Sequence, residues 1–276
     1  NNPNYVYDSN DIEIVLIGDS FVHGSCVGQN SGYAGNLRKL LNNNAVVSIG
    51  WRGAGPYEEL GMMNEYALKL KPKYILWVYF EANDYIEIVR EQKYKILTNY
   101  LYNDSFSQNL MNRNTEIAKI SKKVINKNLK RDFQLTWDDK NVALSYLIHR
   151  FKLWNLRWYF FYKKRWTPNV NSFEFKKFEE IFKSAKSKAE KNGSKLIFVY
   201  QTHKTRYEKT NINNDEYFNR NKILNLVKSL SIPIIDIHEA FTNVNDPLKL
   251  WLDHPNEYGY RIAAEHIYNE IKTKQY

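Results

Sequence analysis

The strongest indication of the fold is the segment Ile14-Val15-Leu16-Ile17-Gly18-Asp19-Ser20. Its first four residues are apolar, which is typical of a strand buried on both faces. Gly-Asp-Ser is an ordinary turn sequence, and a helical pattern follows over Ser31–Leu41. Ser20 therefore stands where a buried strand turns toward a helix. Ligands bind at the carboxyl ends of strands in open α/β sheets, so Ser20 is a candidate substrate contact.

Apolar runs and helical patterns alternate along the chain. We expect strands at 12–17, 45–49, 74–80, 195–200 and 232–237. We expect helices at 31–41, 57–70, 86–102, 173–192, 215–230 and 258–272. This alternation predicts an α/β fold: a three-layer α/β/α sandwich, flavodoxin-like, with a mainly parallel sheet.

The segment 85–190 carries no strand–turn–strand pattern. We interpret residues 1–276 as a single domain in which 85–190 is a helical insertion or cap. Within it, Phe151–Trp166 is dense in aromatic and cationic residues. Such a mixture can stack on sugars and pair with acidic groups, or lie at a membrane surface. It is equally typical of a buried amphipathic helix with basic residues outside.

The composition limits the classes of partner. Hydrophobic residues make up 43% of the 276 residues, which allows a packed core, and the net charge is +10. This charge favours acidic partners such as a polysaccharide or a lipid surface, whereas no recognisable nucleic-acid module is present, so no nucleic acid is expected. The sequence shows no signal peptide and no apolar run of 18 residues. We expect an extracytoplasmic protein whose signal or anchor is missing from this chain.

Cys26 is the only cysteine. No intrachain disulfide can form, and no zinc-binding Cys/His spacing exists, so no metal is expected. We expect Cys26 to be a small packed residue.

Polar residues that suit acyl transfer follow several of the expected strands. Gly53 lies in a glycine-rich loop, Asn83 follows the 74–80 strand, and His254 precedes the last helix. A serine hydroxyl needs a base that titrates near neutrality, which points to histidine. A backbone N–H at glycine and an asparagine amide can stabilise the oxyanion of a tetrahedral intermediate.

With these residues the chain resembles the SGNH (GDSL-like) hydrolase superfamily, which is named for Ser, Gly, Asn and His in four ordered blocks. The blocks here are Gly18-Asp19-Ser20-Phe21, the glycine loop 50–56, Asn83-Asp84 and His254-Pro255-Asn256. The resemblance covers about 12–84 and 195–272 and leaves 85–190 unexplained.

The resemblance implies a role for each residue. Ser20 would be the nucleophile and His254 the general base and then acid. The oxyanion hole would consist of the backbone N–H groups of Ser20 and Gly53 and the side chain of Asn83. Asp19 and Asp84 would organise their loops. The serine mechanism needs no cofactor.

The chain departs from the family at the residue that orients the histidine. The family usually places an aspartate two or three residues before its histidine, but Asp253 is directly adjacent to His254. Neighbouring side chains diverge, so Asp253 completes a triad only if the loop bends sharply. Otherwise a backbone carbonyl near Trp251 accepts the imidazole N–H and the site is a Ser–His dyad.

Further residues are candidate substrate contacts. They are His23, close to Ser20 in sequence, Trp51 in the glycine loop, and His203 after the fourth strand.

These observations predict a serine esterase that removes O-acyl groups, above all acetyl, from a carbohydrate or surface polysaccharide. One alternative is an O-acetyltransferase that uses the same serine and histidine. The other is an inactive protein that binds polysaccharide or membrane through the basic aromatic stretch.

Overall fold

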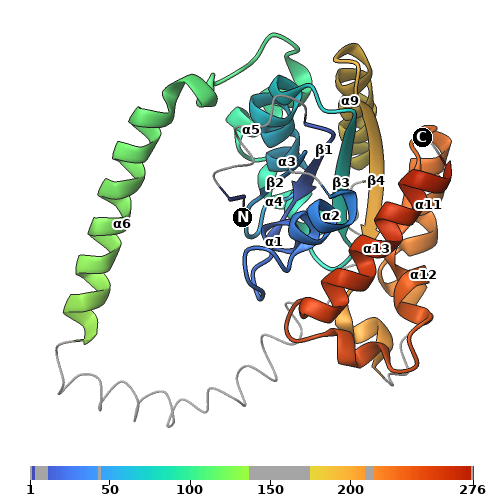
Figure 1. Ribbon diagram of the computed structural model, residues 1–276. Coiled ribbons are helices and arrows are strands. Elements are labelled where there is room, and N and C mark those ends of the chain that lie inside the picture. The colour runs from blue at the N-terminus through green and yellow to red at the C-terminus, as the bar shows by residue number, and fades with distance from the viewer. Residues whose placement is uncertain (1, 4–11, 43–44, 137–174, 209–213, 275) are drawn as a thin grey trace. The chain divides into compact units, whose positions relative to one another are not determined.

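A computed structural model describes residues 2–3, 12–42, 45–136, 175–208, 214–274 and 276 (Figure 1). Its sheet contains β1 (Ile14–Gly18), β2 (Val46–Gly50), β3 (Tyr74–Phe80), β4 (Lys195–Gln201) and β5 (Ile234–Asp236). The order is β2-β1-β3-β4-β5, and every neighbouring pair is parallel. The predicted α/β/α architecture is confirmed, with strand bounds that differ from the prediction by two residues or fewer.

Helices cover both faces of the sheet. One layer contains α3 (Pro56–Met62), α4 (Asp84–Glu91), α5 (Lys95–Tyr102), α9 (Phe175–Lys191) and α11 (Arg220–Ser229). The other layer contains α1 (Ser20–His23), α2 (Tyr33–Leu41), α12 (Ile237–Thr242) and α13 (Glu257–Lys274). Short helical segments lie at Met63–Ala67, Leu68–Leu70, Leu110–Arg113, Lys204–Tyr207, α10 (Asn214–Tyr217) and Pro247–Leu250.

Alternation along the strands divides the core between these two layers. In β1, Val15 and Ile17 pack toward α3 and α9, whereas Ile14 and Leu16 pack toward α2 and α13. All four are almost fully buried, which explains why the strand reads as one continuous apolar run.

Two helix predictions need correction. The expected helix over 86–102 is broken into α4 and α5, because the chain turns where the amide of Tyr94 donates to the carbonyl of Glu91 (2.9 Å). The turn at Gly18-Asp19-Ser20 also starts a helix of its own, α1, before the expected one. Its N-cap is Asp19, whose Oδ1 accepts from the amide of Phe21 at 2.9 Å.

The structure separates into two compact units. The first comprises Asn1–Gln108 and Val170–Tyr276, and the second comprises Asn109–Asn169 and contains α6 (Asn114–Thr136). Within the predicted insertion, α4, α5 and α9 belong to the first unit and contribute buried side chains to its core. The insertion 85–190 as a whole stays a prediction, and the stretch 151–166 lies outside the described residues.

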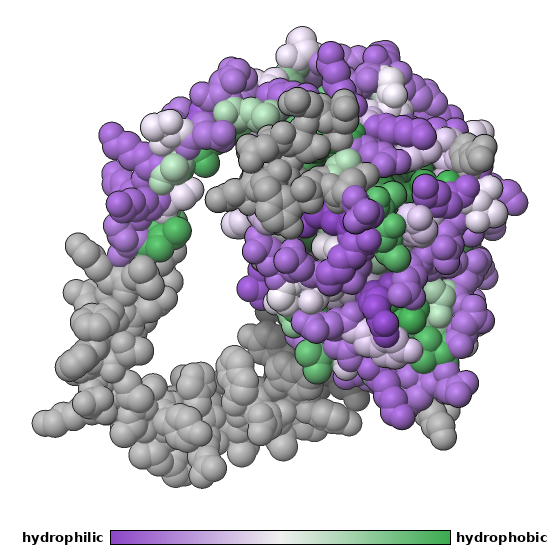
Figure 2. All heavy atoms as spheres, in the orientation of Figure 1, coloured by the Kyte–Doolittle hydropathy of each residue, from purple (hydrophilic) through white to green (hydrophobic). Residues whose placement is uncertain are grey.

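One face of the described part of the molecule is largely polar. On the face shown in Figure 2, hydrophilic residues cover most of the coloured surface, with smaller hydrophobic areas between them. No described helix is both long enough and apolar enough to cross a bilayer.

Gly50 allows α1 to lie against the end of β2. A Cβ atom at Gly50 would stand 2.4 Å from the amide nitrogen of His23 and 2.9 Å from the carbonyl oxygen of Asp19, both backbone atoms. The helix that carries Ser20 therefore depends on the missing side chain.

We expect Gly50→Ala to destabilise the fold by more than about 2 kcal/mol, because backbone must move to admit the methyl group. The matched control is Gly193→Ala, where φ is +78° but no atom lies within 4 Å of the new Cβ; its cost should be about 1 kcal/mol. Urea unfolding followed by circular dichroism measures both. Equal losses in the two variants would contradict the proposed close approach.

Candidate active site

Ser20 and His254 meet at the carboxyl edge of the sheet. Ser20 Oγ lies 2.8 Å from His254 Nε2, although 234 positions separate the residues in the sequence. Ser20 is the first residue of α1, and His254 stands at the tip of a small turn closed by a hydrogen bond from the amide of Leu252 to the carbonyl of His254 (2.8 Å). The pair has the geometry of a nucleophile and its base.

The surroundings of His254 keep its imidazole neutral. Its ring packs against Phe21 at 4.7 Å between centroids. Partial burial lowers the pKa of His254, the positive charge of Arg52 lowers it further, and the negative charge of Asp253 opposes both. A neutral imidazole can accept the proton of a hydroxyl.

The second imidazole nitrogen faces a sulfur atom. His254 Nδ1 lies 3.4 Å from Sγ of Cys26, which is exposed and so is not the packed residue expected from the sequence. Asp253 is exposed too, and it makes no hydrogen bond with another described residue. The structure therefore does not bring the Asp253 carboxylate to Nδ1; adjacent side chains diverge here, as the spacing suggested.

The two predicted oxyanion donors other than Ser20 occupy separate loops. Gly53 follows β2 with φ of +75°, and within the described residues its amide donates no hydrogen bond. Asn83 precedes α4, and its Nδ2 lies 3.5 Å from Oδ2 of Asp19, a long contact. The Oδ1 atom of Asn83 is buried without a hydrogen-bond partner among the described residues.

Asp19 contacts both Ser20 and Asn83. Its Oδ2 atom lies 3.3 Å from Ser20 Oγ and 3.5 Å from Asn83 Nδ2. Burial raises the pKa of Asp19 to about 6, and hydrogen bonds from Phe21, Asn83 and Ser20 oppose the shift.

More carboxyl groups are buried near Asp19. Glu59 accepts from Trp77 Nε1 at 2.6 Å, and Asp84 accepts from the amide of Phe80 at 2.7 Å. Burial raises the pKa of Glu59 and of Asp84 well above the usual range, and the negative charge of Asp19 raises both further. Such groups retain a proton more readily than solvated carboxyls do, so their negative charge near the serine is reduced.

The amino end of α3 is closed by Glu91 of α4. Its carboxylate accepts from the amides of Gly55 (2.7 Å) and Tyr57 (3.0 Å). Burial raises the pKa of Glu91 to about 7. These amides are therefore engaged and do not serve as oxyanion donors. No signal in the sequence predicts this contact, because a glutamate in an amphipathic helix normally faces solvent.

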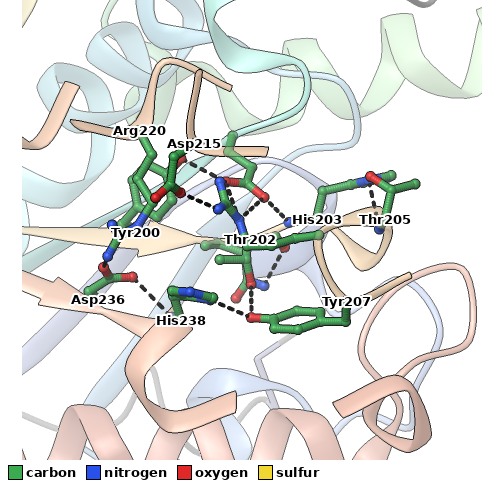
Figure 3. A network of polar contacts seen from close by, with 12 residues as sticks. Tyr200, Thr202, His203, Thr205, Tyr207, Asp215, Arg220, Asp236 and His238 are labelled. Atoms are coloured by element: carbon green, nitrogen blue, oxygen red, sulfur yellow. Dashed lines mark hydrogen bonds and ion pairs between the residues drawn. The ribbon is translucent and has the colours of Figure 1, made fainter. Parts of the chain in front are cut away.

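A buried polar network fixes His203 at the end of β4 (Figure 3). The amide of His203 donates to Glu81 Oε1 at 2.6 Å, and Glu81 pairs with Arg206, whose Nη2 lies 2.6 Å from Oε2. Arg206 also pairs with Asp215, and Tyr200 donates to Glu81 at 2.7 Å. The network holds the loop after β4 in one position.

The imidazole of His203 is held as well. Its Nδ1 atom caps the short helix Lys204–Tyr207 by accepting from the amide of Thr205 at 3.2 Å. Burial lowers the pKa of His203 to about 4, and the charges of Asp253 and His254 act on it in opposite directions. His203 is thus neutral at physiological pH, and its proton lies on Nε2.

The other two predicted contacts, Trp51 and His23, follow β2 and end α1, respectively. Trp51 follows β2, has 62% of its surface exposed, and donates from its amide to the carbonyl of Gly18 at 3.2 Å. His23 ends α1 and contacts Ser25 Oγ through Nδ1 at 3.4 Å; burial lowers its pKa.

No three His, Cys, Asp or Glu side chains among the described residues are grouped as a metal site requires. The site thus consists of a serine, a neutral histidine, candidate oxyanion donors and buried acids, a set that suits acyl transfer.

Solved structures with the same fold are known, although no protein-family model and no curated protein matches this sequence. An acetyl xylan esterase matches with a TM-score of 0.51 at 13% identity, over 94% of this chain and 100% of its own. TesA matches with a TM-score of 0.52 at 11% identity, over 94% of this chain and 98% of its own. A member of the lipolytic G-D-S-L family from Veillonella parvula gives 0.51 at 12% identity, over 95% and 98%. At these identities the likeness concerns the fold.

We expect Arg206→Ala to reduce the free energy of unfolding by about 3–5 kcal/mol, because it leaves the buried Glu81 carboxylate without its partner. Lys183→Ala removes an exposed pair with Glu179 on α9 and should cost less than about 0.5 kcal/mol. Urea denaturation compares the two. A small loss for Arg206→Ala would mean that Glu81 is not held by this pair.

Proposed function

We propose that this chain, which has the fold of SGNH (GDSL-like) hydrolases, is a serine esterase that removes O-acyl groups, above all acetyl, from a carbohydrate. The observation that carries the proposal is the 2.8 Å contact between Ser20 Oγ and His254 Nε2 at the carboxyl edge of the sheet. The likeness to lipolytic G-D-S-L proteins, which share this fold, supports the class of reaction.

In the first half of the proposed reaction, His254 Nε2 takes the proton of Ser20 as Oγ attacks the acyl carbon. The carbonyl π-electrons move to oxygen, and the tetrahedral intermediate carries the charge there. It collapses when the C–O bond to the alcohol breaks and His254 returns its proton to the leaving oxygen. The products are a free alcohol and an acyl-Ser20 ester.

In the second half, water replaces the alcohol. His254 takes a proton from the water as it attacks the acyl-Ser20 carbonyl, and Ser20 Oγ leaves with that proton. The amides of Ser20 and Gly53 and the side chain of Asn83 stabilise the oxyanion in both halves. Asn83 Nδ2 reaches the oxyanion by leaving its long contact with Asp19.

The acetyl and carbohydrate parts of the proposal have their own support. A structure of the same fold is named an acetyl xylan esterase. Trp51 presents an exposed indole in the loop after β2, and flat aromatic surfaces stack on sugar rings. We propose Trp51, His23 and His203 as contacts to the substrate around Ser20.

There are two alternatives to a carbohydrate esterase. An O-acetyltransferase would use the same residues but accept a sugar hydroxyl in place of water in the second half. A binding protein would retain the fold without turnover; the missing carboxylate at His254 Nδ1 favours it. Acidic polysaccharide or membrane contact by the stretch 151–166 belongs to this group of proposals.

We expect Ser20→Ala to abolish hydrolysis of p-nitrophenyl acetate, a loss of at least about 10³-fold, and labelling by a fluorophosphonate. Thr205→Ser on the neighbouring loop is the matched control and should retain both. Wild-type labelling without hydrolysis, followed by acetyl transfer when an acceptor sugar is added, would indicate the transferase. Neither labelling nor turnover in the wild type would indicate the binding protein.

The pH profile follows from the lowered pKa of His254. The base works when neutral, so kcat/KM should fall only as the pH drops through a value below the usual 6.5 of histidine. Arg52→Gln removes a positive charge and should move this acid limb to higher pH. Asp253→Asn removes a negative charge and should move it to lower pH. Shifts in the opposite directions would contradict the assignment of the limb to His254.

A further inference from the structure

We propose that the thiol of Cys26 is the positioning group of His254, in the place where serine hydrolases usually hold a carboxylate. This inference rests on the proposed esterase function and assigns the partner of Nδ1 in the same site. Cys26 is then the third residue of the site, after Ser20 and His254.

The imidazole ring is contacted at both nitrogens. Ser20 Oγ lies 2.8 Å from Nε2, and Cys26 Sγ lies 3.4 Å from Nδ1, a normal distance for a hydrogen bond to sulfur. The face of the ring packs against Phe21. These contacts fix both the position and the tilt of the base.

The backbone ties Cys26 to the nucleophile. The amides of Gly24 and Ser25 both donate to the carbonyl of Ser20, at 3.1 and 3.2 Å. Gly24 has φ of +72°, which turns the chain directly after α1. The loop that carries Cys26 therefore moves with Ser20, and the distances from His254 to the two side chains are coupled.

Asp253 does not compete for this position. It is exposed, and among the described residues it donates or accepts no hydrogen bond. It acts on His254 only through its charge, as Arg52 does with the opposite sign.

The position of the imidazole proton of His254 decides whether the Ser20–His254 pair is productive. Nε2 can accept from Ser20 only when Nδ1 carries the proton and the sulfur accepts it. A thiol can also donate to Nδ1, which puts the imidazole in the wrong tautomer. The pair is therefore productive when the sulfur accepts from the Nδ1–H group, and an acceptor in that position also stabilises the imidazolium that forms during attack.

The first test compares Cys26→Ala with Cys26→Asp. Alanine removes the acceptor, and kcat should fall about tenfold with KM unchanged, whereas aspartate supplies an acceptor without a donor and should raise kcat above the wild type. The Asp variant should also shift the acid limb of the pH profile upward. A thiol with a merely structural role predicts equal losses in both variants, and that result would overturn the proposal. Unfolding curves identify any variant that fails to fold.

The second test needs no turnover. Alkylation of Cys26 by iodoacetamide, followed against pH, reports the thiolate fraction, and Cys26 is the only cysteine of the chain. Wild type should react at lower pH than His254→Gln, because the Nδ1–H group of the neutral imidazole donates to the sulfur and stabilises the thiolate. Ser20→Ala should match wild type in this assay.

The two tests separate the two proposals. Identical alkylation profiles in wild type and His254→Gln overturn the role of Cys26, whatever the esterase result. A clear difference with no ester hydrolysis by the wild type retains the Cys26–His254 pair and overturns the proposed hydrolytic function.

Discussion

The parallel register of β1, β2 and β3 is the constraint on which the site depends. Gly18 of β1 pairs with Gly50 of β2 on one side and with Val78 of β3 on the other. These strands therefore end at the same edge, and the loops that follow them carry Ser20, Gly53 and Asn83. The missing side chains at Gly18 and Gly50 allow α1 to begin directly on that edge. His254 is then delivered by the turn before α13, which packs on α2.

Hydrogen bonding and burial have opposite effects on the pKa of the carboxyl groups at this edge of the sheet. Asp19, Glu59 and Asp84 are fully buried, and each accepts at least one hydrogen bond from a backbone or indole N–H. Desolvation nevertheless outweighs those bonds and raises the pKa of each carboxyl. A fully charged cluster beneath the serine would repel the oxyanion of the proposed reaction. Partial protonation of these groups reduces that repulsion and leaves their oxygen atoms in place as loop anchors.

The sequence could predict what is encoded locally. Apolar runs such as Tyr74–Phe80 identify buried strands, and the residues at their ends identify the edge where Ser20 and His254 meet. It could not predict contacts that depend on the side-chain direction of residues distant in sequence. Glu91 looks like a surface glutamate of a helix, yet it caps α3, and Cys26 looks like a packed residue, yet it faces His254. Because Asp253 directly precedes His254, the sequence indicated that the usual acceptor for Nδ1 is missing. It did not indicate which residue replaces it.

In the proposed site, a thiol in place of a carboxylate changes the proton balance between Ser20 and His254. A carboxylate stabilises the imidazolium and so increases the basicity of histidine, whereas burial and Arg52 lower the pKa of His254 here. A weaker base remains neutral over a wider pH range but takes the serine proton less readily. Acceptors more acidic than a sugar hydroxyl, or esters with good leaving groups, demand less of such a base. The partner of Nδ1 therefore bears on substrate choice as well as on rate, since it sets how basic His254 becomes at the moment of attack.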